Sequence, residues 1–182
     1  MAELVVVRRY TKALFQAARN ASQVDAVQAD LEAVAGAMRD VPALLRALRA
    51  PTVSTEKKRA IVDGAFAGQI SPLTLKFIQL LIDRRREAIL PDVPDDFLRL
   101  ANEWRNLLPA HVRAAAPLSD EEQAEIVEVL SRKTGMNVTL QVEVDPSLIG
   151  GLYVRMGDTV IDGTLKTRLA QVKARLLAGR LF

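Results

Sequence analysis

The chain has 182 residues, 49% of them hydrophobic and 26% charged, so it can bury a core in one domain or in two small ones. It has no cysteine, which excludes disulfides, thiol nucleophiles and cysteine-ligated metals, and its single histidine, His111, excludes mechanisms that need two. A net charge of +3 does not by itself indicate nucleic-acid binding.

The first hundred residues predict six helices in succession, because apolar residues recur there at every third or fourth position. The apolar stripes lie, in chain order, at 6–17, 24–38, 41–48, 60–66, 73–82 and 97–108. Ser54 is expected to cap the fourth helix, and Ser71 followed by Pro72 is expected to start the fifth. Short turns between these helices predict a compact six-helix bundle over 1–108.

Two features of this half leave alternatives open. The first 20 residues are amphipathic and contain arginine, as a transit peptide does, but they lack serine and their pattern favours an ordinary core-facing helix. The fifth helix is apolar over most of its circumference, so it is either buried or presents a second face to a partner.

No apolar run in the sequence approaches the roughly 20 residues that cross a bilayer.

From Pro109 the pattern changes, and 109–182 is expected to form a small α/β domain. Residues 111–116 alternate weakly and predict a strand, which we expect at the edge of a sheet, while 137–144 alternate clearly. Ser119 and Glu122 form a capping box at the start of an intervening helix. Two short strands around Gly157-Asp158 predict a hairpin.

The chain is expected to end in a helix over 164–178. Its apolar stripe consists of Leu165, Leu169, Val172 and Leu176. The rest of its surface is basic, with Lys166, Arg168, Lys173 and Arg175 and no acid, whereas the helix that begins at Ser119 is acidic. The fold class predicted is therefore mostly α, with an N-terminal helical bundle, a β-hairpin and a C-terminal helix.

The stretch GGLYVRMGDTVIDG, 150–163, resembles a ligand loop at first sight. A phosphate-binding loop needs lysine after its last glycine, where Asp158 stands and would repel phosphate. Asp158 and Asp162 lack the third acid expected of a divalent-cation site. The favoured interpretation is structural: Gly150 and Gly151 redirect the chain, Gly157-Asp158 turns the hairpin, and Asp162 caps the last helix.

Other charged clusters have ordinary structural explanations. Asp92, Asp95 and Asp96 lie near a predicted helix start, where acids are favoured by the helix dipole. The basic run 84–86 lies at a helix end and suits a solvated face, an acidic protein segment or, with less support, nucleic acid. The sequence therefore predicts no catalytic residues, no cofactor and no metal, which is the profile of a connector between proteins.

Four segments, in order along the chain, resemble one protein family. They are YTKALFQAA at 10–18, LKFIQLLIDRRREAIL at 75–90, AAPLSDEE at 115–122 and VDPSLIGGLYVRMGDTVIDGTLKTRL at 144–169. Together they resemble the delta subunit of the bacterial F-type ATP synthase, the oligomycin-sensitivity-conferring protein of mitochondria. The chain departs from the family pattern at Thr11, Thr164 and Lys76, and the last departure affects contacts near the bundle surface.

The resemblance implies a non-catalytic connector in the peripheral stalk, which ties the catalytic head to the b subunits against the torque of proton-driven rotation. Domain 1–108 would bind the N-terminal helix of an alpha subunit, and domain 109–182 the C-termini of the b subunits. The alpha-binding residues implied are Tyr10, Ala13, Leu14, Ala17, Phe77, Leu81 and Arg84. The family also implies a peripheral place on the cytoplasmic face of the plasma membrane, with no membrane insertion, no nucleic acid and no functional homo-oligomer. A helical adaptor of another complex is the alternative.

Overall fold

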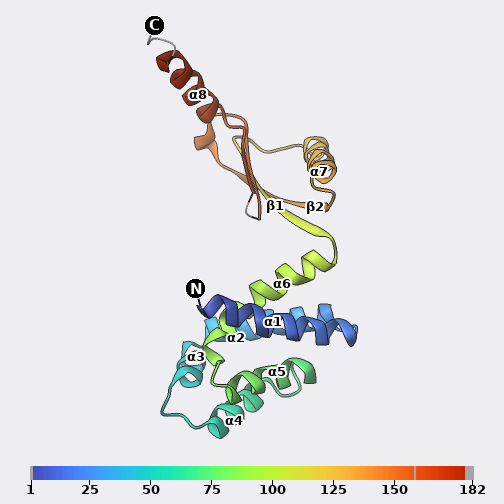
Figure 1. Cartoon of the computed structure of the whole chain (residues 1–182), viewed down its shortest axis with the longest axis vertical. Helices are drawn as coiled ribbons and strands as arrows, with labels where there is room; N and C mark the ends of the chain where they lie inside the picture. The colour runs from blue at the N-terminus through green and yellow to red at the C-terminus, as the bar shows by residue number, and fades with distance from the viewer. Residues whose placement is uncertain (1, 158, 179–182) are drawn as a thin grey trace. The chain divides into compact units, whose positions relative to one another are not determined.

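The computed structural model describes residues 2–157 and 159–178 (Figure 1). The chain divides into two compact units, unit 1 from Met1 to Ala101 and unit 2 from Asn102 to Phe182. The described residues are mostly helical, with a four-stranded sheet in unit 2 and a helix after it, which confirms the mostly α class and the small sheet. The six-helix bundle remains a prediction. The division falls after Ala101, whereas the sequence placed the boundary after Leu108.

Unit 1 is built from five α-helices, the greater part of a sixth and one 3-10 helix. Their bounds are α1 Ala2–Asn20, α2 Val24–Asp40, α3 Pro42–Arg49, α4 Thr55–Phe66, α5 Pro72–Asp83, η1 Glu87–Asp92 and α6 Val93–Trp104. Two helix starts follow the predicted signals: the Ser54 hydroxyl accepts a hydrogen bond from the Lys57 amide, and the Ser71 hydroxyl one from the Thr74 amide. Side-chain caps of this kind satisfy amides that a helix leaves unpaired at its first turn.

Unit 1 has one aliphatic core with a small aromatic centre. Phe97 of α6 is fully buried and meets Phe15 of α1 edge to face, with ring centroids 5.6 Å apart. Residues from α1 to α6 and η1 contribute to this core, so the helices depend on one another for burial. The other fully buried large apolar side chains are Val27, Leu31, Val34, Leu48, Val62, Ile78, Leu81, Ile82 and Val93.

A buried ion pair joins α4 to η1, and nothing in the sequence pattern predicted it. Lys58 donates a hydrogen bond to Glu87, and the two side chains are only 8% and 9% exposed. Each charge compensates the other, because a lone charge removed from water is costly. Removing either partner would leave an uncompensated charge in the core of unit 1.

Unit 2 contains the sheet and two helices. The bounds are β1 Leu107–Ala114, α7 Asp120–Thr134, β2 Asn137–Val144, η2 Pro146–Leu148, β3 Leu152–Met156, β4 Thr159–Asp162 and α8 Leu165–Ala178. The strand order is β2-β1-β3-β4, with β1 parallel to β2 and antiparallel to β3, and β3 antiparallel to β4. The helix α7 is the crossover that the parallel pair β1–β2 requires.

The sequence placed the first strand wrongly. β1 begins at Leu107, because Leu107 already pairs with Asn137 of β2, and α6 consequently ends at Trp104 rather than at Leu108. β1 is also a central strand, paired on both sides, and not an edge strand. His111 is exposed on the face of the sheet that α7 does not cover, opposite the buried Ala110 and Val112.

Three further predictions for unit 2 are confirmed. β2 spans the predicted residues, and the Met156–Thr159 pair closes the predicted hairpin. The predicted capping box is present: the Ser119 amide donates to the Glu122 carboxylate, and the Glu122 amide donates to the Ser119 hydroxyl. The hydrogen bond from the Ser119 amide lowers the pKa of Glu122. The core beneath α7 is small, and its fully buried members are Ala110, Val112, Leu130, Val138, Val154 and Met156.

Candidate functional site

One flank of α1 presents small and half-buried side chains. Val6, Tyr10 and Ala17 are half-buried and Ala13 is exposed, and their spacing places all four on one side of the helix. Leu14, by contrast, is only 3% exposed and belongs to the core. Of the α1 residues named from the sequence, Tyr10, Ala13 and Ala17 are therefore available to a partner, and Leu14 supports them from beneath.

The helix α5 packs against α1 and shows the same division. Phe77 and Leu81 lie in the core, whereas Arg84 is exposed. The exposed row of α5 also includes Lys76 and Leu80, each four residues from the next, and Leu80 is 42% exposed between two cations. Leu80 was not among the contacts predicted from the sequence, although the fifth helix is apolar over most of its circumference and this signal includes Leu80.

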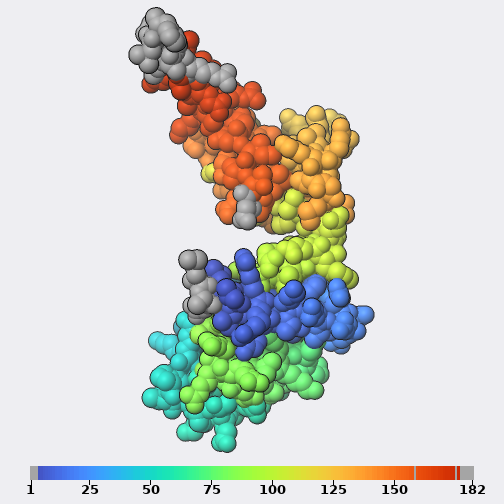
Figure 2. Space-filling view, in the orientation of Figure 1, coloured from blue at the N-terminus to red at the C-terminus, as the bar shows by residue number. Residues whose placement is uncertain are grey.

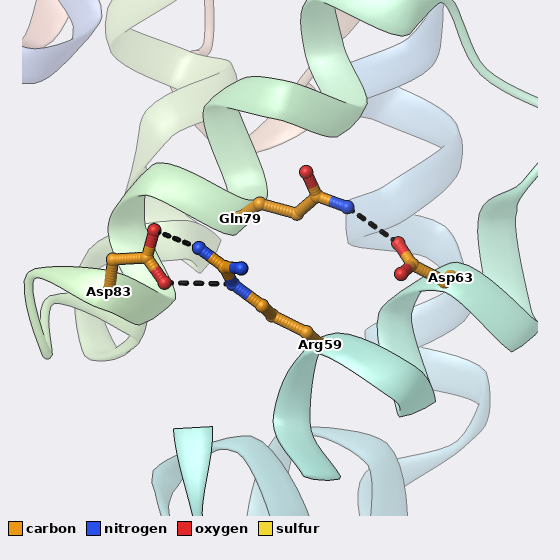
Figure 3. Close-up of polar contacts among 4 residues, drawn as sticks. All are labelled: Arg59, Asp63, Gln79 and Asp83. Carbon is orange, nitrogen blue, oxygen red and sulfur yellow. Dashed lines mark hydrogen bonds and ion pairs between the residues drawn. The ribbon is translucent and has the colours of Figure 1, made fainter. Parts of the chain in front are cut away.

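Two polar contacts fix α5 against α4 (Figure 3). The Arg59 guanidinium donates to both carboxylate oxygens of Asp83, at 2.8 Å for the Nε bond, and its pKa is raised by the hydrogen bond to Asp83. One turn earlier on α5, Gln79 donates to Asp63 of α4 at 2.7 Å. Because these two contacts lie one turn apart along both helices, they set the rotation of α5 as well as its position.

The helix α2 anchors the start of α5. The Asp30 carboxylate accepts hydrogen bonds from the Ser71 amide and from the Thr74 hydroxyl, both at 2.9 Å. Thr74 is fully buried, so this carboxylate supplies the partner that its hydroxyl needs inside the unit. With α4 holding its second half and α2 its start, α5 presents Lys76, Leu80 and Arg84 on a fixed surface.

In unit 2 the root of α8 is locked by a polar network. Thr164 caps the helix, with its hydroxyl accepting from the Thr167 amide at 3.3 Å. Asp162 accepts from the Thr164 amide at 3.0 Å and from the Thr167 hydroxyl at 2.8 Å. These bonds to the ionised carboxylate, the first of them above all, lower the pKa of Asp162. Asp162, which the sequence predicted as the cap of this helix, therefore acts together with Thr164.

The glycines of the family signature fit the chain closely around this root. Gly151 has φ +83°, and a Cβ at this position would lie 2.4 Å from the Gly163 carbonyl oxygen. A Cβ on Gly150 would lie 2.7 Å from a methyl carbon of Leu165, and the Gly150 carbonyl accepts the Leu165 amide at 2.9 Å. Gly157 has a positive φ of 53° in the hairpin turn, as expected, and Asp158 lies outside the described residues.

The helix α8 exposes the whole of its apolar stripe. In Figure 2 the described part of this helix, in red, extends away from the rest of unit 2. The exposed fractions are 44% for Leu165, 64% for Leu169, 52% for Val172 and 68% for Leu176. Four large apolar side chains on one helical stripe form a surface of the kind that binds protein partners. The described basic side chains of α8, Lys166, Arg168 and Lys173, are exposed around it.

An open groove of about 890 Å³ begins where the α8 stripe begins. Leu165 and Arg168 of α8 line one end, and Ile126 and Val129 of α7 line one wall. Its remaining apolar lining comes from the chain before α7, the loop at Ile149 and strands β3 and β4, and includes Leu118, Leu152, Val154 and Ile161. Groove and stripe thus form one continuous apolar surface in unit 2.

The described residues contain neither a metal-binding cluster nor a membrane-spanning helix. Over 2–157 and 159–178, no three His, Asp or Glu side chains come together as a metal site would require. Within the same residues, none of the helices combines the length and apolarity needed to cross a membrane. The two candidate surfaces are the exposed row of α5 and the apolar stripe of α8. Each has apolar side chains at its centre and charged side chains at its border, which suits the binding of a protein partner.

Comparison with known proteins gives the class of this chain. Residues 6–176 match the family described as the ATP synthase delta (OSCP) subunit. The ATP synthase subunit delta of Desulforudis audaxviator is 39% identical over 168 residues, covering 92% of each chain, and that of Desulforamulus reducens is 38% identical over 173 residues, covering 95% of this chain and 96% of the other. The chain therefore belongs to the ATP synthase delta (OSCP) subunit family.

A solved structure supports the same assignment. A chain of the Toxoplasma gondii mitochondrial ATP synthase hexamer superposes with a TM-score of 0.63 at 26% identity, covering 94% of this chain and 97% of that one. The chain is thus a peripheral-stalk subunit of an F-type ATP synthase, a structural part of a membrane-bound complex and not its catalyst.

Proposed function

We propose that the two units divide the work of a stator connector between them. Unit 1, acting as a six-helix bundle, binds the N-terminal helix of an alpha subunit along α1 and α5. Unit 2 binds the C-terminal ends of the b subunits along α8 and its groove. The complex would hold this chain on the cytoplasmic face of the plasma membrane.

The uncovered stripe of α8 carries the proposal most strongly. A helix whose apolar face is more than 40% exposed at every described position gains little from its own unit, so its sequence is suited to a partner. The stripe repeats at intervals of three and four residues, as in helix-to-helix packing. Its basic border favours b-subunit ends that carry acidic residues.

On unit 1, the exposed row of α5 defines the chemistry of the alpha helix. Leu80 lies between Lys76 and Arg84, so a matching helix places an apolar residue over Leu80 and acidic residues over the two cations. The small side chain of Ala13 on α1 allows a partner helix to approach closely. Leu14, Phe77 and Leu81 hold the two helices together and do not touch the partner directly.

Paired variants of the full chain test this division. Ala13→Trp fills the α1 flank and should weaken binding of an alpha N-terminal peptide at least tenfold by calorimetry, while b-subunit binding is unchanged. Leu169→Asp should do the reverse, weakening binding of a soluble b-subunit fragment and leaving the alpha peptide unaffected. Gln16→Trp and Gln171→Asp, both at exposed positions off these surfaces, serve as matched controls. Loss of both partners in either variant would contradict the proposed division.

A further inference from the structure

The strand β2 forms an edge of the unit 2 sheet, at the opposite end of the strand order from β4 and the root of α8. It is eight residues long and pairs with β1 over its whole length without a bulge. The surface along its other side is therefore separate from the α8 stripe and groove.

Hydrogen bonds at both ends of β2 show which backbone groups face this edge. The Asn137 amide donates to the Asn106 carbonyl at 2.9 Å, and the Asp145 amide donates to the Ala114 carbonyl at 2.8 Å, so the odd-numbered residues face β1. Successive residues of a strand point their N–H and C=O groups to opposite sides. The even-numbered residues of β2 must then face outward.

Only the first of these outward amides is satisfied within the described part of the chain. The Val138 amide donates to the Ser131 hydroxyl of α7 at 3.2 Å, which confirms its outward direction. The amides of Leu140, Val142 and Val144 have no such partner among the described residues. β2 also contains no proline and no lysine, the residues with which proteins commonly protect an edge strand.

The side chains beside this edge define what it would accept. Leu140 and Val142 pack against the unit 2 core on the α7 side, so an added strand continues that layer with apolar residues at alternate positions. On the flank of α7 beside the edge, Glu128 is already paired with Arg132 at 2.7 Å, whereas Glu143 is exposed on the other face of β2. A second copy of this chain would bring a second Glu143 to the edge, whereas a basic segment would place a cation opposite this carboxylate.

We propose that the free edge of β2 binds an extended, basic polypeptide segment as a fifth strand of the unit 2 sheet. The amides of Leu140, Val142 and Val144 donate to carbonyls of this segment, and a Lys or Arg side chain of the segment meets Glu143. The proposal rests on the proposed function only in that the segment belongs to another subunit of the ATP synthase.

Hydrogen exchange compares the full chain alone with the same chain in the assembled ATP synthase. In the free chain, the amides of Leu140, Val142 and Val144 should exchange at least tenfold faster than those of Gln141 and Glu143, which bond to β1. In the assembled enzyme, the three should slow at least tenfold. Unchanged fast exchange in the assembled enzyme would overturn the proposal. So would protection in the free chain that grows with concentration and accompanies a dimer in sedimentation, since the occupant would then be a second copy.

A proline variant tests the same edge by binding. Val142→Pro removes an outward amide and no bond to β1, and Val142→Thr is the matched control, because it keeps the amide and a similar shape. Binding to ATP synthase depleted of this subunit should fall at least fivefold for Val142→Pro and less than twofold for Val142→Thr. Equal binding of both variants overturns the edge proposal alone, whereas failure of the unaltered chain to bind would overturn the proposed function. If Val142→Pro does not fold, the exchange comparison on the unaltered chain decides.

Discussion

The two units of this chain bury their apolar residues to very different extents. Among the described residues, 21 side chains form the buried core of unit 1, and six form that of unit 2. Unit 2 nevertheless carries the longest exposed apolar stripe, on α8. The described apolar side chains of α8 are suited to packing against another helix, yet each of them is exposed.

The difference shows how a connector can be organised. Unit 1 has an extensive core of its own, and its proposed partner surface is a short row of exposed side chains on α5. Unit 2 has a smaller core and leaves a groove, a helix face and a strand edge uncovered, so a partner would add to its core and to its sheet. We therefore expect unit 1 to be the more stable unit in the free chain, and unit 2 to gain more stability on assembly.

The largest expected effect comes from the core of unit 1. Phe97→Ala removes a fully buried ring and its contact with Phe15, and should lower the unfolding free energy of unit 1 by about 3–5 kcal/mol. Urea unfolding followed by hydrogen exchange in each unit measures this. If unit 2 loses protection to the same extent, the two units unfold as one and the comparison fails.

A smaller effect is expected from one glycine in each unit. Gly151→Ala places a Cβ against the Gly163 carbonyl at a positive φ, and should destabilise unit 2 by about 1–3 kcal/mol. Gly64→Ala, within α4 and with no atom near its Cβ, is the control and should stabilise unit 1 by up to about 1 kcal/mol. Thermal unfolding of the two variants should therefore shift in opposite directions.

Acidification should loosen the root of α8. The folded-state pKa of Asp162 lies below its ordinary value of about 3.9, so the carboxylate stabilises the folded root above that value. This contribution is lost as the pH falls through the lowered pKa. Exchange of the Thr164 and Thr167 amides should accelerate in that range, and Asp162→Asn should remove the pH dependence. An unchanged pH profile in the variant would show that another group is responsible.

The smallest effect on stability is expected on the α8 stripe. Leu169→Gln alters a side chain that is 64% exposed, and should change the melting temperature of the free chain by an amount corresponding to less than about 0.5 kcal/mol. The same substitution at Leu31, fully buried in α2, should unfold unit 1. A large loss for Leu169→Gln would mean that α8 packs within its own unit in solution.

Local signals in the sequence predicted much of the fold. Three of these signals span only a few residues, so each could be recognised without knowing the rest of the chain. They are Ser71 with Pro72, the capping box at Ser119 and the alternation of 137–144. The start of β1 could not, because Leu107 is a strand residue only by pairing with Asn137, thirty residues away. The buried pair of Lys58 and Glu87 depends on tertiary packing in the same way.

The candidate surfaces were predicted less well than the fold. A period of three or four residues marks an apolar helix face but does not say whether that face meets the protein core or a partner. Leu14, Phe77 and Leu81 were assigned to the partner and lie in the core, while Leu80 was passed over and is exposed. The contacts with alpha and b subunits remain predictions.

The attachment of α8 at its first turn has a mechanical consequence. The described side chains beyond Thr167 are exposed, so the helix extends roughly 20 Å as a lever held only at its root. A sideways force at the far end of α8 would exert its torque on the bonds of Asp162 and Thr164 through the full length of the helix. The same force applied near Leu165 would exert almost no torque on these bonds. A partner that binds the groove as well as the helix would therefore apply part of its force close to the root, where the torque on these bonds is smallest.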